Sequence, residues 1–288
     1  YNKSLEYYNK ALEKFKALDD KQKIAHLYDL IGHIYEDKGN VNETIKYWEL
    51  GKNIYAEIGD EDGIITFIVH KSLLYEKNCD YDKAIDYQLD ALERENKLHK
   101  IKIPLNQAFV FEQLGTLNYK IGAYEKSLKF LHKSYKVISE FNNKIDESTN
   151  ILNFIGSNYL NTGNYDKAEQ YLGKSRAIQM DAEQTDKASK VKYRTDDLLI
   201  TSTCLYLSLK NLGKEYDEKE IHTLVKEAEN IEFEANLRLY ELLEDTSFLE
   251  NAYNQIQEKA DNLEPDIAAK FLNYPIPKAI VEEWEKVK

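Results

Sequence analysis

The sequence predicts an all-α protein, an α-solenoid of stacked helical hairpins that ends in C-terminal capping helices. Three observations indicate this fold. A six-residue motif recurs along the chain, the apolar residues ahead of each copy follow helical spacing, and a glycine ends most of those helices. Regular self-similarity is typical of repeat proteins, in which each copy buries its apolar flank against the next copy.

The recurring motif is clearest at residues 163–168, which read Gly-Asn-Tyr-Asp-Lys-Ala. It returns at residues 122–127 and 79–84, is fainter at 39–44 and fades at 213–217. The copies therefore repeat at intervals of 40 to 50 residues, which is long enough for a pair of helices and their turns.

Each motif has the composition of a turn between two helices. Gly39, Gly122 and Gly163 stand where a helix ends in a left-handed residue, a conformation that costs glycine no Cβ clash. Asp82 and Asp166 fall in the first turn of the following helix, where a negative charge meets the positive end of the helix dipole. The motif therefore predicts a helix–turn–helix hinge.

A second small residue precedes each hinge by seven positions and gives the pattern Leu/Ile-Gly-x-x-Tyr, best seen at residues 155–159. These small residues are Gly32, Ser72, Gly115 and Gly156. With Ala168, Leu172 and Ser175 in the second helix, the pattern resembles the tetratricopeptide repeat. The resemblance implies a right-handed superhelix in which the first helix of each copy lines a concave surface.

Two features depart from that family. Gln88 replaces the aromatic residue of the second helix and Asn118 replaces the tyrosine of the first. The period also exceeds the usual length of about 34 residues. Long copies of this kind are similar to those of bacterial regulators, including the quorum-sensing peptide receptors of the Rap kind and repeat regions fused to ATPase modules.

The repeat pattern divides the chain into an array and an end segment. We expect residues 1–246 to form the array, beginning in the middle of a repeat as a fragment of a longer protein would. The expected copies lie near residues 1–20, 24–60, 64–100, 104–142, 148–180 and 196–231, with a divergent hairpin from 233. We expect residues 247–288 to form the capping helices, with Trp284 either covering the last hairpin or belonging to a linker helix. The polar residues 181–195 predict either extended helices or a mobile connection.

Composition restricts the class of partner. The net charge is −12 and the 39 basic residues are scattered, so no basic stripe indicates nucleic acid. No apolar run approaches the roughly 20 residues of a membrane span, and no secretory signal is visible. Cys79 and Cys204 are interpreted as small buried hydrophobes in a reducing compartment. We therefore predict a cytoplasmic protein that does not bind membranes.

The sequence contains no Gly-rich phosphate loop, no metalloprotease helix motif and no cysteine pair at zinc spacing, so we predict neither an enzyme nor a cofactor. One chemical constellation stands out, formed by His26, Asp29, His33 and Glu36, whose spacings place them on one helix face. Imidazole and carboxylate groups can bind zinc or transfer protons. The stripe is about 15 Å long, however, so its outer members cannot share one ion and no metal is expected.

The resemblance implies instead that this stripe lies on the ligand-binding concave surface, although a plainly solvated face is equally compatible with the residues. The predicted ligand-groove residues beyond the stripe are Glu76, Glu112, Thr116, Asn150, Asn153 and Ser157, and Tyr119 and Asn161 occupy matching inner positions. Asparagine side chains on such a surface can pair with the backbone of an extended peptide.

The function predicted from these observations is a non-catalytic protein- or peptide-binding scaffold, the interaction or regulatory region of a larger signalling protein. It would hold an extended or helical segment in the groove, and a small-molecule ligand is not expected. The alternative is a peptide-pheromone receptor of the Rap kind. An enzyme that uses the His26–Glu36 stripe is the third hypothesis.

Overall fold

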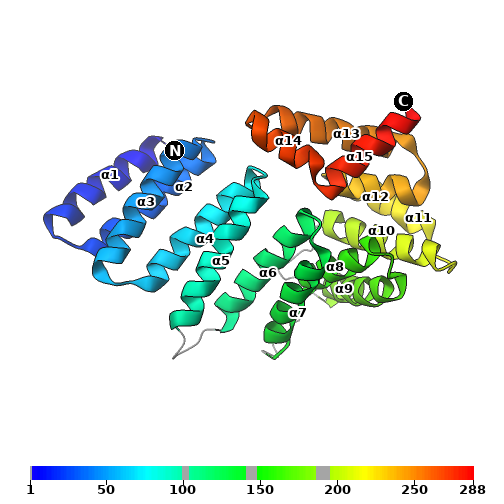
Figure 1. The fold of residues 1–288 in the computed structure, drawn as a ribbon, viewed down its shortest axis with the longest axis horizontal. Coiled ribbons are helices and arrows are strands. Elements are labelled where there is room, and N and C mark those ends of the chain that lie inside the picture. The colour runs from blue at the N-terminus through cyan, green and yellow to red at the C-terminus, as the bar shows by residue number, and fades with distance from the viewer. Residues whose placement is uncertain (1, 99–103, 141–147, 186–194) are drawn as a thin grey trace. The chain divides into compact units, whose positions relative to one another are not determined.

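The computed structural model describes residues 2–98, 104–140, 148–185 and 195–288, and these ranges form fifteen α-helices and no β-strand (Figure 1). The predicted all-α class is confirmed. None of the helices in these ranges is long and apolar enough to cross a membrane. The chain divides into two compact units, Tyr1–Lys102 and Ile103–Lys288.

The first unit holds α1 to α5. Its helices are α1 (Asn2–Ala17), α2 (Lys21–Asp37), α3 (Val41–Ile58), α4 (Glu61–Lys77) and α5 (Tyr81–Leu98). The pairs α2–α3 and α4–α5 are hairpins, and α1 and α3 pack on the helix that follows each of them. Because α1 packs on α2 as α3 packs on α4, it takes the place of a second helix of a hairpin.

The second unit holds the remaining helices. They are α6 (Pro104–Lys120), α7 (Tyr124–Glu140), α8 (Thr149–Asn161), α9 (Tyr165–Thr185), α10 (Thr195–Asn211), α11 (Glu218–Glu227), α12 (Phe233–Leu243), α13 (Thr246–Asp261), α14 (Pro265–Asn273) and α15 (Pro275–Val287). The pairs α6–α7 and α8–α9 are hairpins, and the first helices α6, α8 and α10 also contact one another in sequence. Most of the predicted polar connection, residues 186–194, lies outside the described residues.

The hinges follow the predicted chemistry. Gly39, Gly122 and Gly163 have φ values of 71°, 81° and 73°, the left-handed conformation that ends a helix. The next residue then bonds back across the turn, as when Asn164 N donates to Tyr159 O at 2.8 Å. Cys79 adopts the same conformation with φ 59°, although it carries a side chain.

The small residues ahead of each hinge allow close packing between the helices of a hairpin. A Cβ on Gly115 would lie 2.5 Å from Leu131 Cγ, and a Cβ on Gly156 would lie 2.8 Å from Leu172 Cδ2. Both leucines are buried on the second helix. Ser72 serves the same role differently, because its hydroxyl donates to Ala84 O at 2.8 Å.

Within the second unit, the last helix packs back on earlier helices. Pro275, at the start of α15, touches Gly122 in the turn between α6 and α7. Trp284 stacks on Tyr253 of α13, with ring centroids 5.4 Å apart. The two cysteines, Cys79 and Cys204, are free and buried.

Candidate functional site

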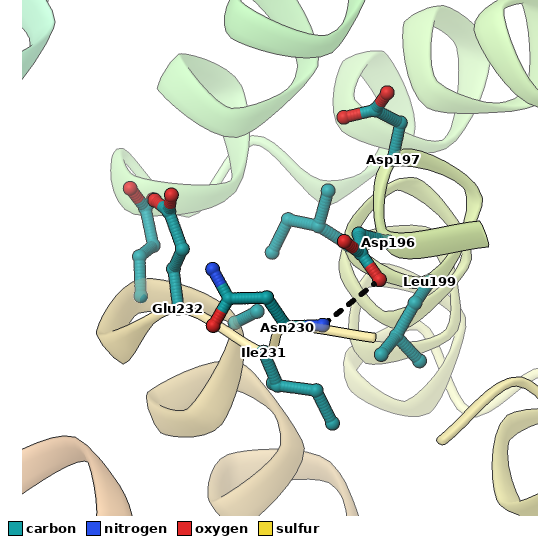
Figure 2. A pocket seen from close by; sticks show the side chains of 9 residues that line it. Asp196, Asp197, Leu199, Asn230, Ile231 and Glu232 are labelled. Carbon is teal, nitrogen blue, oxygen red and sulfur yellow. Dashed lines mark hydrogen bonds between the residues drawn. The ribbon is translucent and has the colours of Figure 1, made fainter. Parts of the chain in front are cut away.

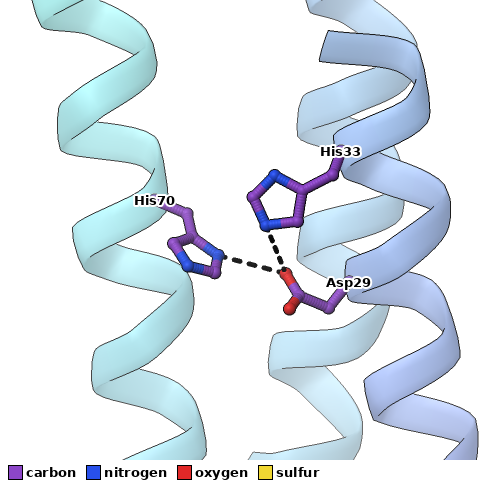
Figure 3. A group of neighbouring side chains, drawn as sticks. All are labelled: Asp29, His33 and His70. Atoms are coloured by element: carbon purple, nitrogen blue, oxygen red, sulfur yellow. Dashed lines mark hydrogen bonds and ion pairs between the residues drawn. The ribbon is translucent and has the colours of Figure 1, made fainter. Parts of the chain in front are cut away.

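In the first unit, α2 and α4 bring two histidines around one carboxylate (Figure 3). Asp29 Oδ1 lies 3.0 Å from His70 Nδ1 and 3.6 Å from His33 Nε2. Asp29 and His33 are one turn apart on α2, whereas His70 comes from α4. One ligand atom from each of the three side chains lies within 4.8 Å of the other two.

A second carboxylate, that of Glu36, contacts the other ring nitrogen of His33. Its Nδ1 lies 3.1 Å from Glu36 Oε2, so both ring nitrogens of His33 face carboxylate oxygens. Lys77 Nζ approaches the other Glu36 oxygen at 3.9 Å. Because Asp29 and Glu36 are both anions when ionised, the cluster has the electrostatics of a site for a cation.

The floor of this cluster is aromatic. Trp48 of α3 is 1% exposed, and its ring centroid lies 5.2 Å from that of His33 and 5.4 Å from that of His70. Its indole Nε1 donates to the backbone oxygen of Asp29 at 3.4 Å. The side chains of Asp29, His33 and His70 are 17%, 42% and 20% exposed, so the opposite side of the cluster is open to solvent.

The predicted stripe is therefore divided. Asp29 and Glu36 both contact His33. His26 is exposed one turn earlier and lies outside the cluster that the described residues form. Glu76, from the next copy, is half-buried. His70 was not in the predicted set. The signal that points to it is a histidine on the neighbouring first helix, about one repeat length after Asp29.

In the second unit, the predicted inner residues lie on α6 and α8. Asn150 is exposed and its Nδ2 donates to Glu112 Oε1 at 2.6 Å, which joins the two first helices. Asn153 is half-buried, and its Oδ1 is a buried acceptor with no hydrogen-bond partner in the described part of the chain. Ser157 is half-buried beside Cys204 of α10, where burial raises the pKa of the thiol to about 12 and Ser157 lowers it slightly. Thr116 is 5% exposed and its hydroxyl donates a hydrogen bond to Gln113 O in the same helix, so it offers no group to a surface ligand.

Tyr119 and Asn161, the other inner positions, are engaged by α12. The Tyr119 hydroxyl donates to Glu234, and Asn161 Nδ2 donates to the Tyr119 oxygen at 3.1 Å. The guanidinium of Arg238 donates to Asn161 Oδ1 and, at 2.9 Å, to Glu241. Burial, followed by the charge of Glu234, raises the pKa of Tyr119 well above its usual value. This stretch of the inner surface is therefore covered by the protein's own helix.

Two hollows open beside α12. The larger, of about 690 Å³, is lined by Asn161, Lys210, Asn211, Arg238 and Glu241 among others. The smaller, of about 210 Å³, is acidic, with Asp196, Asp197, Glu232 and Glu234 in its wall (Figure 2). Asp196 Oδ1 accepts hydrogen bonds from the backbone of Glu229 and Asn230, so this carboxylate serves the loop before α12.

A family model for the tetratricopeptide repeat matches residues 149–182, which are α8 and most of α9. No curated protein sequence matches the chain. BtubC (BKLC) from P. vanneervenii superposes with a TM-score of 0.63 at 13% identity over 78% of this chain and 88% of its own. The apo form of RapI gives 0.61 at 16% identity over 98% and 92%.

A third similar structure is a signal transduction ATPase with numerous domains from Pyrococcus horikoshii, which has a tetratricopeptide repeat sensor. It superposes with a TM-score of 0.59 at 15% identity over 97% of this chain. This chain spans 41% of the length of that protein. At such identities these structures establish a shared fold. With the hinges, the small residues and the matched repeat, they show that the chain is a tetratricopeptide repeat protein of the all-α solenoid class.

Proposed function

We propose that the chain is a non-catalytic scaffold whose first helices bind an extended or helical segment of a protein or peptide. It would serve as the interaction or regulatory region of a larger cytoplasmic signalling protein, a role supported by its likeness to the fold of an ATPase with a repeat sensor. The net charge of −12 favours a neutral or basic segment over nucleic acid.

The observation that carries this proposal is the pair of amides on α8. Asn153 Oδ1 is a buried acceptor without a partner in the described ranges, and an acceptor left in that state costs about 1–3 kcal/mol. Turning this amide toward the surface would expose the oxygen to an N–H group of a bound backbone, and the hydrogen bond formed there would recover that energy. One turn away, Asn150 is exposed and already bonded to Glu112, so its remaining amide groups face solvent. An amide matches a peptide unit in both donors and acceptors.

The test begins with the purified 288-residue chain and a displayed library of random peptides. Enriched sequences are synthesised and their affinities are measured by calorimetry. Replacing Asn150 and Asn153 together by alanine removes about two hydrogen bonds of 0.5–1.5 kcal/mol each, so the dissociation constant should rise about 5- to 150-fold. Gln170→Ala is the matched control, because it removes an exposed amide from the second helix α9.

The proposal fails if no sequence is enriched. It also fails if the enriched peptides bind the double alanine variant as tightly as they bind the control.

A receptor for short peptides of the Rap kind is the second candidate. It is favoured by the match to RapI, which extends over nearly the whole of both chains and so includes the C-terminal helices. Short free peptides should then bind as tightly as the same sequences embedded in a longer segment. A strict requirement for the longer segment would favour the scaffold.

A further inference from the structure

We propose that Asp29, His33 and His70 bind a divalent transition metal ion of the zinc class, and that Glu36 orients His33 from outside the coordination sphere. The ion would join α2 to α4, which are the first helices of successive hairpins in the first unit. This proposal does not depend on the scaffold function, because it concerns a different group of residues and a different ligand.

The spacing of the ligand atoms around Asp29 is close to that of such an ion. Zinc binds nitrogen and oxygen at about 2.0–2.2 Å, and a tetrahedron of that size separates its ligand atoms by about 3.3–3.6 Å. The distance from Asp29 Oδ1 to His33, 3.6 Å, lies at the upper end of that range, and the distance to His70, 3.0 Å, is slightly below it. All three ligand atoms lie within 4.8 Å of one another. Two imidazoles and one carboxylate suit zinc, nickel or copper better than calcium or magnesium, which prefer oxygen ligands alone.

The partners of His33 also suit a metal ligand. A neutral imidazole has one N–H group and one lone pair. When Nδ1–H donates to Glu36 at 3.1 Å, the lone pair of Nε2 faces Asp29, and a metal ion would lie between these two side chains. That arrangement is the carboxylate–histidine–metal triad by which proteins fix the orientation of a ligating ring.

The surroundings complete an open site. The Trp48 ring closes one side, and the exposure of His33 leaves the other side to a water molecule as fourth ligand. Three protein ligands with one open position are an arrangement that proteins use for accessible zinc. Because the indole lies about as close to His33 as to His70, its fluorescence reports on the ion.

The experiment uses the full chain carrying Trp284→Phe, which leaves Trp48 as the sole tryptophan. Metal-free protein is titrated with Co²⁺, a paramagnetic quencher, and then with Zn²⁺ as a diamagnetic competitor. The emission of Trp48 should fall to a plateau at one equivalent of Co²⁺ and recover on addition of Zn²⁺. His70→Gln should weaken binding at least about 100-fold and Glu36→Gln about 10- to 100-fold.

The matched control is His26→Gln, which removes an exposed imidazole from the same helix and should leave the affinity unchanged. Circular dichroism shows that each variant is folded. Glu36→Gln removes only a charge, so it tests the proposal even if His70→Gln unfolds. The proposal is overturned by the absence of saturable quenching, by quenching that persists in both variants, or by emission that responds to pH but not to metal.

Discussion

The contact between the two helices of a hairpin can be tested at Gly156. Replacing it by alanine places a Cβ 2.8 Å from Leu172 Cδ2 and closer still to Cγ, well inside the roughly 3.5–4.0 Å at which carbon atoms normally meet. Leu172 is 1% exposed on α9, so it cannot turn into solvent. Overpacking of this kind costs about 1–3 kcal/mol.

Part of that cost is offset, because alanine is about 1 kcal/mol better than glycine inside a helix. The same hairpin supplies a control for this term. Gly173, in the interior of α9, has nothing within 4 Å of the position that an added Cβ would occupy, so Gly173→Ala should stabilise the protein by up to about 1 kcal/mol. The gain in helix propensity from glycine to alanine is the same in both variants, so it cancels when their stabilities are compared. Gly156→Ala should therefore be about 1–3 kcal/mol less stable than Gly173→Ala.

Urea unfolding followed by circular dichroism measures this difference. In a Leu172→Ala background the clashing atoms are gone, so Gly156→Ala should lose most of its penalty. The reasoning is refuted if the two glycine variants are equally stable. It is also refuted if the penalty stays the same after Leu172 has been truncated.

Three further predictions follow from buried groups and from the metal cluster. Burial raises the pKa of the Cys204 thiol from 9.0 to about 12. The stability that the buried neutral thiol contributes is therefore complete below pH 9 and is lost as the pH rises toward 12. Cys204→Ala should flatten the dependence of the urea midpoint on pH in that range. Arg238→Met removes a buried guanidinium from its half-buried partners Asn161 and Glu241 and should cost about 1–3 kcal/mol in urea unfolding, whereas Arg94→Met, at a partly exposed pair, should cost less than about 1 kcal/mol. Zinc at 100 times its dissociation constant should stabilise the chain by about 2.7 kcal/mol in thermal unfolding, and His33→Gln should abolish this gain.

The hairpins could be predicted from the sequence because their signals are local. Gly122 and Gly163 adopt the left-handed conformation that their positions in the motif require. Gly115 and Gly156 face leucines of the second helix only 16 residues later, so spacing within one copy is sufficient to pair them. Cys79 shows the limit of this reasoning, since a left-handed residue with a side chain is not expected from its type.

The surroundings of the inner residues could be predicted only in part. Tyr119 and Asn161 occupy inner positions, but no sequence pattern indicates that Arg238 and Glu234 reach them. These partners lie on α12, 77 residues after Asn161 in the case of Arg238. A contact at that separation depends on how the divergent C-terminal helices pack back, and no repeat period encodes it.

Contacts between the first helices of successive copies are less predictable than the contacts within a hairpin but more predictable than those made by α12. Asp29 meets His70 at a separation of 41 residues, Glu112 meets Asn150 at 38, and Tyr119 meets Asn161 at 42. The hinges of the same copies are 40 and 41 residues apart. The separation of each contacting pair therefore differs from the repeat length by three residues or fewer, which is less than one helical turn. A search confined to one helix finds Asp29 and His33 but not His70. A search of the next first helix, one turn to either side of the repeat period, would have found all three metal-binding candidates.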